Sequence, residues 1–445
     1  MSQSKTNTNN KGSMKWWQLS LFGVGCTIGT GFFLGSSFGI KLGGPSILIG
    51  FVLAGLTTYL VFDALARMTA NDPQKGAFRT YAKKALGHWA GFSVGWVYWS
   101  SEMLIMGSQL TALSIFTRFW FPNIPMWIFA TGYGVLGLVV LLAGAKKLSK
   151  LENIFAVIKI AAIVMFIAIA AAFVFGWIDT SKNLAVPNSI GEWFPKGFLG
   201  FWSSLIFAFY AFGGIEVMGL MATELKNPKD APKAGSIMLI VLVIIYVLSI
   251  GLALLLIPWD GFNTDDSPFV TVLEEYNLSI MPHVFNGALI IAGFSTMVAA
   301  LYGVTTILGS LAEDGDAPKV FAKKGKLKIP FASLVLLIIV LIGSIIMALV
   351  LPEKIYEYIT TGAGLMLLYN WLFILTSGHK LNSPNAFGKI KYVLGMTLVL
   401  AGISGTLISS SNRPGFFISI GFVCLIVIVT FIMSKKWKKQ EAKKG

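Results

Sequence analysis

The sequence predicts an all-α integral membrane protein with twelve transmembrane helices. The chain has 445 residues, of which 55% are hydrophobic and 12% charged, and its mean hydropathy is +0.74. About 20 apolar residues are needed for each span, and twelve apolar runs of this kind follow one another along the chain. The first fourteen residues are polar and include Lys5 and Lys11, so we expect no cleavable signal peptide.

The spans are expected near residues 16–38, 45–68, 91–117, 124–144, 152–176, 197–222, 235–258, 283–311, 331–351, 355–377, 392–410 and 415–434. A tail of residues 1–15 precedes them, and a basic tail of residues 435–445 follows. The connection from Pro258 to Pro282 carries five acidic residues and no Lys or Arg, and we expect it to cap the outer vestibule. Between Asp72 and Trp89, basic and apolar residues recur at helical spacing, which favours a helix along the inner interface.

The net charge of +15 follows from the way basic residues are distributed among the loops. With the N-terminus in the cytoplasm, 28 of the 35 Lys and Arg residues fall in cytoplasmic segments and six in outer segments, while Lys159 lies inside a span. The positive-inside rule then sets both termini on the cytoplasmic side of the plasma membrane. Membrane topology accounts for the charge, so the expected partner is the lipid bilayer and no nucleic-acid partner is predicted.

The first span contains five glycines between Leu21 and Gly35. Each interior glycine weakens a helix by roughly 0.8 to 1 kcal/mol relative to alanine, and hydrocarbon offers no water to the backbone groups that a broken helix frees. We expect the helix to unwind from Gly25 to Gly31 and to restart at Thr30–Gly31, because a half-helix N-terminus attracts an anion. The alternative is that these glycines allow close helix packing.

A second interruption is predicted in the sixth span, at Phe209–Glu216, where Gly213 and Gly214 are adjacent. Two interrupted helices five spans apart indicate an inverted repeat with its binding site between the halves.

Four ionisable residues fall within predicted spans: Asp63, Glu102, Lys159 and Glu216. A charge at a helix centre costs about 2.5 to 3.5 kcal/mol on insertion scales, so each is a candidate functional residue. Asp63 is the exception, because Arg67 follows one turn later and the two side chains can pair.

The sequence leaves more than one role open for each of Lys159, Glu216 and Glu102. Lys159 lies roughly 12 Å from the inner end of its span at 1.5 Å per residue. If it is buried it can exchange protons, because burial favours the neutral amine; as a fixed ammonium it can replace a bound sodium ion or stay pinned to backbone carbonyls. Glu216 can accept hydrogen bonds from the second interruption or carry a proton. Glu102 shares a helix face with Gln109 and can serve as a proton site, a contact for a cationic substrate or a partner of Lys159.

The sequence contains no pattern that indicates enzymatic chemistry or a metal. Cys26 and Cys424 lie in different spans, and His88, His283 and His379 lie at span ends or in loops, where an interfacial role is expected. This spacing forms neither a disulfide framework nor a metal-ligand cluster. A nucleophile elbow and a phosphate-binding loop are also missing from the sequence.

Several motifs occur in order along the chain: Ile28–Gly35, Gly76–Phe78 with Tyr81–Ala82, Gly95–Trp99, Phe212–Glu216, Glu224–Pro228 with Pro232–Ala234, and Leu311–Lys319. Together they strongly resemble amino-acid permeases of the amino acid-polyamine-organocation (APC) superfamily, and in particular its bacterial amino acid transporter (AAT) branch. The resemblance extends from about residue 16 to residue 377.

This resemblance implies a leucine-transporter-like fold of two inverted five-helix repeats, residues 16–176 and 197–377, with two peripheral helices in residues 392–434. It also implies an α-amino acid bound between the two interruptions. The substrate-binding positions that it implies are Thr27, Ile28, Gly29, Thr30, Gly31, Tyr210, Ala211 and Gly213.

By the same resemblance, the substrate carboxylate would meet the Thr30 hydroxyl and the Gly31 N–H. The ammonium would meet the carbonyls of Thr27, Tyr210 and Gly213. Tyr210 also matches the aromatic gate of the family, and Lys159 matches the lysine of span five that replaces sodium in proton-coupled relatives.

The chain departs from the family pattern at three places. Gln109 stands where many relatives have glutamate, and Glu102 stands where they have a neutral residue. The segment from Tyr302 to Ser310 lacks an arginine that is common there. These departures leave the substrate and the proton path open.

The sequence therefore predicts an amino-acid permease that works by alternating access and takes up its substrate with protons as the coupling ion, without a cofactor or metal. Exchange of one amino acid for another is an alternative, because a static lysine serves it equally well. A second alternative is a sensor that binds an amino acid without moving it. A channel is not indicated, because no repeated pore loop is visible. The identity of the amino acid and the oligomeric state are left open.

Overall fold

The computed structural model describes residues 14–74, 76–143, 145–178, 183–323, 330–350 and 354–441. Of the two predicted tails, residues 1–13 and 442–445 lie outside the described residues. The described chain is almost entirely helical and has no β-strand; Met14 and Leu225 form an isolated bridge. The sequence prediction of an all-α protein is confirmed at this level.

The helices follow the predicted apolar runs. Their bounds are α1 (Trp16–Thr27), α2 (Thr30–Phe33), α3 (Gly35–Gly43), α4 (Ile47–Asn71), α5 (Ala77–Leu86), α6 (His88–Arg118), α7 (Met126–Ala143), α8 (Ala145–Val174), α9 (Ile190–Trp193), α10 (Gly197–Tyr210), α11 (Ile215–Met221), α12 (Ala231–Leu256), α13 (Pro268–Glu275), α14 (Met281–Glu313), α15 (Phe331–Val350), α16 (Ile355–Leu381), α17 (Ala386–Gly405) and α18 (Arg413–Glu441). Short 3-10 turns occur between several of them, including η5 (Lys319–Ala322) after α14.

Nine helical segments of the described residues are long and apolar enough to cross a membrane. They do not include α6, whose 31 residues carry Glu102, Gln109 and several serines. Polar residues in a helix of this length indicate that the helix is enclosed by others, and most of the polar side chains of α6 are indeed buried.

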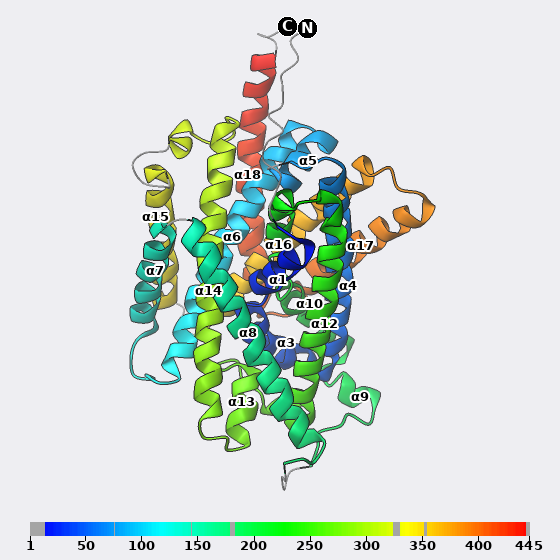
Figure 1. The fold of residues 1–445 in the computed structure, drawn as a ribbon, viewed down its shortest axis with the longest axis vertical. Coiled ribbons are helices and arrows are strands. Elements are labelled where there is room, and N and C mark those ends of the chain that lie inside the picture. The colour runs from blue at the N-terminus through cyan, green and yellow to red at the C-terminus, as the bar shows by residue number, and fades with distance from the viewer. Residues whose placement is uncertain are drawn as a thin grey trace.

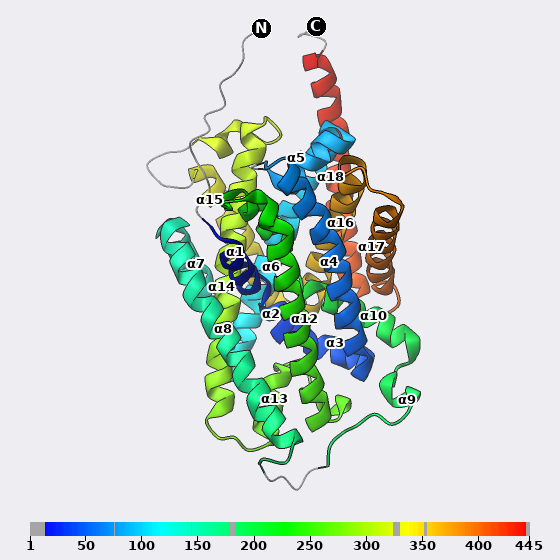
Figure 2. The same ribbon diagram turned by 45° about the vertical axis from the view of Figure 1, so that its right-hand side comes forward.

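Helix α6 packs against both α14 and α16 in the middle of the molecule. Helices α7 and α15 pack together on one side of this group, and α17 and α18 pack against α16 on another. The short helices α2, α3 and α11 lie within the bundle, between longer helices (Figure 1; Figure 2).

Segments predicted to lie on the same side of the membrane occupy the same end of the molecule. Figure 1 shows α5 and the end of α18 at one end, and α9 and α13 at the other. Helix α5 ends at Gly87, whose φ of +98° is readily adopted by glycine and allows the sharp turn into α6. A helix is thus present between Asp72 and Trp89, over Ala77–Leu86, while its place at the inner interface stays a prediction.

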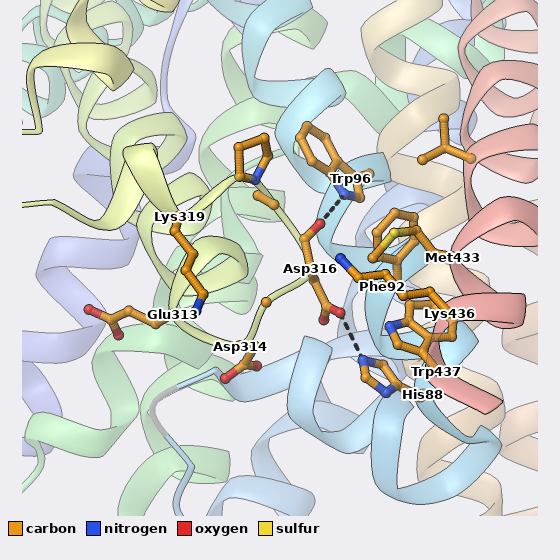
Figure 3. Close-up of a pocket in the computed structure, with 14 residues that line it drawn as sticks. His88, Phe92, Trp96, Glu313, Asp314, Asp316, Lys319, Met433, Lys436 and Trp437 are labelled. Carbon is orange, nitrogen blue, oxygen red and sulfur yellow. Dashed lines mark hydrogen bonds and ion pairs between the residues drawn. The ribbon is translucent and has the colours of Figure 1, made fainter. Parts of the chain in front are cut away.

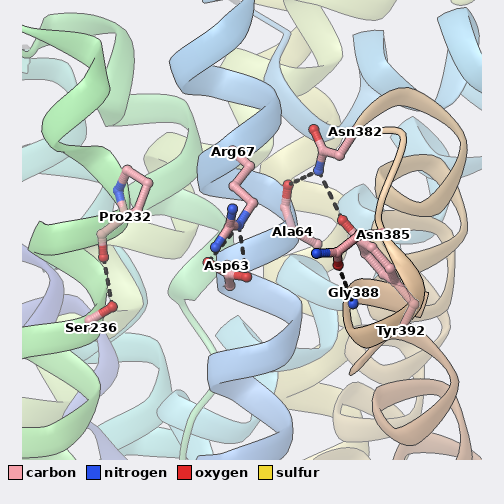
Figure 4. Close-up of polar contacts among 9 residues, drawn as sticks. All are labelled: Asp63, Ala64, Arg67, Pro232, Ser236, Asn382, Asn385, Gly388 and Tyr392. Atoms are coloured by element: carbon pink, nitrogen blue, oxygen red, sulfur yellow. Dashed lines mark hydrogen bonds and ion pairs between the residues drawn. The ribbon is translucent and has the colours of Figure 1, made fainter. Parts of the chain in front are cut away.

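Polar contacts fasten the turn between α16 and α17 to α4 (Figure 4). The side-chain amide of Asn382 donates to the Ala64 carbonyl at 3.2 Å and to the Tyr392 hydroxyl at 2.9 Å. Within α4, Arg67 and Asp63 form the predicted ion pair at 2.9 Å. The structural role expected for Asp63 is therefore confirmed.

Candidate functional site

The first transmembrane segment is interrupted by two residues. Helix α1 ends at Thr27, Ile28 and Gly29 are extended, and α2 begins at Thr30. The hydrogen bonds of the new helix start with the N–H groups of Phe32 and Phe33, which both donate to the Gly29 carbonyl at 3.1 Å. The restart at Thr30 agrees with the sequence prediction.

The predicted start of the unwound stretch at Gly25 is wrong, because α1 stays helical through Thr27. A Cβ on Gly25 would lie 2.7 Å from the Cβ of Ala156 on α8, and one on Gly23 would lie 2.3 Å from the sulfur of Met218. Both distances are shorter than real contacts allow. Gly23 and Gly25 therefore serve close helix packing, and only the later glycines belong to the interruption.

The second interruption lies where the sequence predicts it. Helix α10 ends at Tyr210 and α11 begins at Ile215, with Gly214 at a φ of +106°. The N–H of Gly213 donates to the Tyr210 carbonyl at 3.0 Å. A Cβ on Gly214 would lie 3.2 Å from the Cys26 carbonyl oxygen. The end of α1 and the interruption between α10 and α11 are thus in direct contact.

Tyr210 covers the start of α2. A Cβ on Gly31 would lie 2.8 Å from Cδ1 of the Tyr210 ring, and the Tyr210 hydroxyl is 2.6 Å from the Ser108 hydroxyl on α6. A second tyrosine, Tyr356 of α16, donates to the Thr30 carbonyl at 2.8 Å. The two rings close the space beside α2, and Tyr210 is itself only 5% exposed.

Polar atoms without hydrogen-bond partners gather at this point. The hydroxyl oxygens of Thr27 and Thr30 and the amide oxygen of Gln109 are buried and have no partner among the described residues. Ala211, in contrast, has its carbonyl bonded to the Tyr246 hydroxyl at 3.0 Å. Buried polar atoms are nearly always hydrogen-bonded in folded proteins, so unpartnered ones mark a place where a polar ligand can bind.

Lys159 joins three helices next to the first interruption. From α8, its ammonium donates to the Gly25 carbonyl at 2.7 Å and to the Thr296 hydroxyl of α14 at 3.5 Å. Thr296 also faces the interruption, because a Cβ on Gly29 would lie 2.7 Å from its hydroxyl oxygen. The Lys159 side chain is fully buried. More of the helix precedes Lys159 than predicted, because α8 begins at Ala145 and not near residue 152.

The two buried glutamates differ in how they are held. Glu216 accepts a hydrogen bond from the Gly214 N–H at 3.2 Å and another from the indole N–H of Trp371. Glu102 lies on α6 and faces α14, where a Cβ on Gly303 would come 3.9 Å from its Oε2. Glu216 thus braces the second interruption, as the sequence allowed, whereas Glu102 lies on α6, one helix away from it.

A charged cluster at the end of the bundle was not predicted from the sequence. The guanidinium of Arg79 on α5 lies 2.7 Å from the Asp314 carboxylate and 2.6 Å from the Asp316 carboxylate. His88 is 2.8 Å from the other oxygen of Asp316 and stacks on Trp437 of α18, with ring centroids 4.1 Å apart (Figure 3). His88 thus lies at a helix end, as predicted, and has specific partners there that the sequence did not indicate. The only signal in the sequence was that Arg79 directly follows the Gly76–Phe78 motif and Asp316 lies within the Leu311–Lys319 motif.

A cavity of about 690 Å³ lies where the start of α6 meets the ends of α14 and α18, and His88, Asp314, Asp316 and Trp437 are among the residues that line it. Figure 3 shows the side chains that form it, and no residue of either interruption is among them. The predicted substrate positions Thr27 to Gly31 and Tyr210 to Gly213 instead come together deep in the bundle, with Lys159 and Glu216 beside them. Ser108, Thr296 and Tyr356 complete this group, and hydroxyls on long helices carry no sequence signal that would have identified them.

Comparison with known proteins places nearly the whole chain in one family. Residues 18–441 match the protein family described as amino acid permease. The chain is 56% identical over 437 residues to "Uncharacterized transporter YcgH" of Bacillus subtilis, with 98% of each chain covered. It is 29% identical over 434 residues to "Aromatic amino acid transport protein AroP" of Escherichia coli strain K12, with 94% of each covered, and 29% identical over 447 residues to the protein of that name in Salmonella typhimurium strain LT2, with 96% of each covered.

The match covers nearly the whole described chain, including both interruptions and the charged cluster. A protein of this kind moves a small molecule through a membrane and does not transform it. The chain belongs to the amino acid permease family of the APC superfamily.

Proposed function

We propose that this protein carries an α-amino acid across the plasma membrane by alternating access, with protons as the coupling ion. Twelve spans, with the first ten forming two inverted five-helix repeats, enclose the binding site, and both termini lie in the cytoplasm. The family supports amino acid transport, and the excess of basic residues in the segments near α5 and α18 supports this orientation.

The observation that carries the proposal is the meeting of two helix interruptions around unpartnered hydroxyls. The end of α1 offers carbonyl groups, which carry partial negative charge, and the start of α2 offers N–H groups, which carry partial positive charge. A zwitterion needs both kinds of partner within a few ångströms. The buried hydroxyls of Thr27 and Thr30 lie at this junction and lack a partner among the described residues.

Substrate contacts are proposed at Thr27–Gly31, Tyr210, Ala211 and Gly213. The carboxylate would bind the Thr30 hydroxyl and the Gly31 N–H, and the ammonium would bind carbonyls of Thr27, Tyr210 and Gly213. Tyr210 would act as the gate, because its ring lies over Gly31 and its hydroxyl reaches Ser108 at 2.6 Å.

A binding screen of the twenty amino acids against the purified protein tests this site. Aromatic amino acids come first, because two of the relatives are named as aromatic amino acid transport proteins. Binding of an α-amino acid that fails when its carboxylate is amidated supports the site. Equal binding of the free and the amidated compound contradicts it.

Exchange is the second candidate, and one observation favours it. The ammonium of Lys159 is bonded to the Gly25 carbonyl at 2.7 Å, and a lysine that keeps its proton needs no proton flux. Labelled uptake and internal pH measured together in reconstituted vesicles separate the two modes. Accumulation of labelled amino acid that is driven by an imposed proton gradient supports symport. Uptake that depends only on amino acid inside the vesicles supports exchange.

The same vesicles distinguish a carrier from a sensor. Vesicles loaded with unlabelled amino acid should draw in labelled amino acid by counterflow. Binding to the purified protein without any counterflow would indicate a sensor.

A further inference from the structure

Three ionisable side chains are buried inside the helical bundle near the proposed site. Lys159 and Glu216 have no exposed surface, and Glu102 is 5% exposed. If transport is coupled to protons, as proposed above, these three are the candidates inside the bundle for the group that gains and loses a proton in each cycle. The hydrogen-bond partners of the three side chains differ, and these partners indicate which side chain can exchange a proton.

Lys159 is held as a cation. Its ammonium donates to the Gly25 carbonyl at 2.7 Å and to the Thr296 hydroxyl at 3.5 Å. Gly25 lies in the last turn of α1, where the helix dipole places partial negative charge and favours a positive group. A neutral amine would still donate to these two acceptors, but the hydrogen bonds would lose their charge-assisted strength, so these contacts favour the ammonium form.

Glu216 is held as an anion. Each of its two oxygens accepts one hydrogen bond, one from the Gly214 N–H at 3.2 Å and the other from the Trp371 indole N–H. Both donors are fixed by the fold, and N–H groups cannot act as acceptors. A protonated carboxyl group would therefore lose one of these bonds without gaining another, and the charged form is favoured.

Glu102 differs from Glu216 because no backbone or indole N–H donates to it in the hydrogen bonds of the described residues. Among these residues no ion pair includes its carboxylate either. Its neighbours are the hydroxyl of Tyr98 one turn away, which can donate to it, and Gly303 of α14. Glu216 of α11 is near enough to interact with it electrostatically. A buried carboxylate beside a second, fixed carboxylate is stabilised by binding a proton.

The titratable groups near Glu102 come from several helices. They are Tyr98 on its own helix, Cys26 of α1, which faces Tyr98, Tyr210 of α10 and Glu216 of α11. Helix α14 contributes Gly303 at this point. Glu216 is the other carboxyl group in this set, and its two N–H donors favour its charged form. A charge on Glu102 would then face a like charge, with no cation in this set to offset it.

Glu102 also has a suitable position along the transport path. It precedes Ser108, which holds the Tyr210 hydroxyl, by about 9 Å along α6 at 1.5 Å per residue. It lies on the side of Ser108 that leads to His88 and the end of α18. A proton bound there sits between the substrate position and the end of the molecule that we assign to the cytoplasm.

We propose that Glu102 is the group that binds and releases the coupled proton, while Lys159 and Glu216 keep their charges throughout the cycle. The carboxylate of Glu102 takes up one proton when the site opens outward, becomes neutral, and gives that proton to the cytoplasm when the site opens inward. One proton and one zwitterion then move together, and one positive charge crosses per substrate.

The test compares Glu102→Gln with the wild type in reconstituted vesicles. Glutamine keeps the shape of a neutral glutamic acid but cannot exchange a proton. We expect complete loss of proton-driven accumulation above equilibrium, together with continued counterflow, which shows that the variant is folded and still binds substrate. Glu102→Asp is expected to restore accumulation, and Asp63→Asn, at the exposed pair on α4, serves as the matched control that keeps it.

A second variant separates Glu102 from Lys159. Lys159→Arg keeps a positive charge that does not dissociate in proteins, so it is expected to accumulate substrate with the proton gradient at whatever turnover it retains. Loss of accumulation in Lys159→Arg with retained counterflow, and normal accumulation in Glu102→Gln, would make the lysine the proton carrier and overturn the assignment.

The outcomes also separate this inference from the function on which it rests. A wild-type protein that gives counterflow but no response to a proton gradient would end the symport proposal and the assignment of Glu102 with it. A wild-type protein and a Glu102→Gln variant that both respond to the gradient would leave symport standing and exclude Glu102 alone.

Discussion

The guanidinium of Arg79 and the carboxylate of Asp316 lie 2.6 Å apart although 237 residues separate them in the sequence. Both side chains are buried, with 4% and 0% exposed. Arg79 also reaches Asp314, and His88 occupies the second oxygen of Asp316. This pair joins α5 to the turn after α14 at the end of the bundle assigned to the cytoplasm.

Removing the buried acid should therefore destabilise the protein strongly. Asp316→Asn is expected to lower the free energy of unfolding by about 1.5 to 3 kcal/mol, because the buried Arg79 would lose its buried partner and keep only the half-exposed Asp314. Thermal unfolding of the purified protein measures the loss. Asp314→Asn is the matched control: its side chain is 46% exposed, and such a pair contributes about 0 to 1 kcal/mol. Equal losses in the two variants would contradict the distinction.

Gly31→Val should abolish substrate binding while the protein still inserts into the membrane. Even a Cβ at this position would lie 2.8 Å from the Tyr210 ring, so valine would displace the proposed gate and cover the Gly31 N–H. Binding measured by scintillation proximity or calorimetry checks this. Gly35→Ala, one turn later, is the control, because its Cβ would find its nearest neighbour at 3.8 Å; wild-type affinity in Gly31→Val would reject the site.

The hydrogen bond between Tyr210 and Ser108 should hold the gate closed over substrate. Tyr210→Phe and Ser108→Ala each remove it, at a cost of about 1 kcal/mol, which corresponds to roughly fivefold weaker binding. The double variant should be little worse than either single one, because both remove the same interaction. Fully additive losses in affinity would mean that the two hydroxyls act separately.

The outer connection should be sensitive to pH through Asp266. Burial is the main cause that raises the pKa of this carboxyl group, and the neighbouring charge of Asp265 adds to it. The backbone carbonyl of Asp266 accepts a hydrogen bond from the Ser37 hydroxyl of α3 at 2.7 Å, so this residue holds the connection against the bundle.

A raised pKa in the folded state means that the neutral carboxyl is favoured by folding. The stabilisation is complete below the ordinary pKa of aspartate, about 3.9, and is lost as the pH rises through the raised value. Hydrogen exchange of the Asn263–Ser267 backbone should therefore quicken with rising pH beyond its intrinsic dependence. Asp266→Asn should remove this additional pH dependence of hydrogen exchange. Asp265→Asn, at the exposed neighbour, should reduce it only slightly. An unchanged pH dependence in Asp266→Asn would contradict the role given to Asp266.

The sequence predicted the helical segments and both interruptions because these depend on local composition. Apolar length sets the helices, and Gly29 and Gly214 occupy positions where the chain is extended or has a positive φ. The same local reasoning placed Gly25 wrongly, since its packing against Ala156 depends on α8. The start of α8 was also missed, because Lys146 to Lys150 continue the helix beyond its apolar part.

Contacts between distant segments could not be predicted in this way. The pairing of Arg79 with Asp316 and the stacking of His88 on Trp437 depend on which helix ends meet. For the buried charges, the sequence identified Lys159, Glu102 and Glu216 but left their roles open. Their hydrogen-bond partners distinguish them, and those partners lie on α1, α14 and α16 as well as beside the second interruption.

The last turn of α1 gives the protein a built-in chemical reporter. Cys26 is buried beside the second interruption and outside any disulfide, while Cys424, the other cysteine, faces outward from α18. Once Cys424 is replaced by serine, a water-soluble maleimide can label the chain only when solvent enters between α1 and α11. The rate of that labelling, followed with and without amino acid, would record the opening of the transport path without an engineered probe.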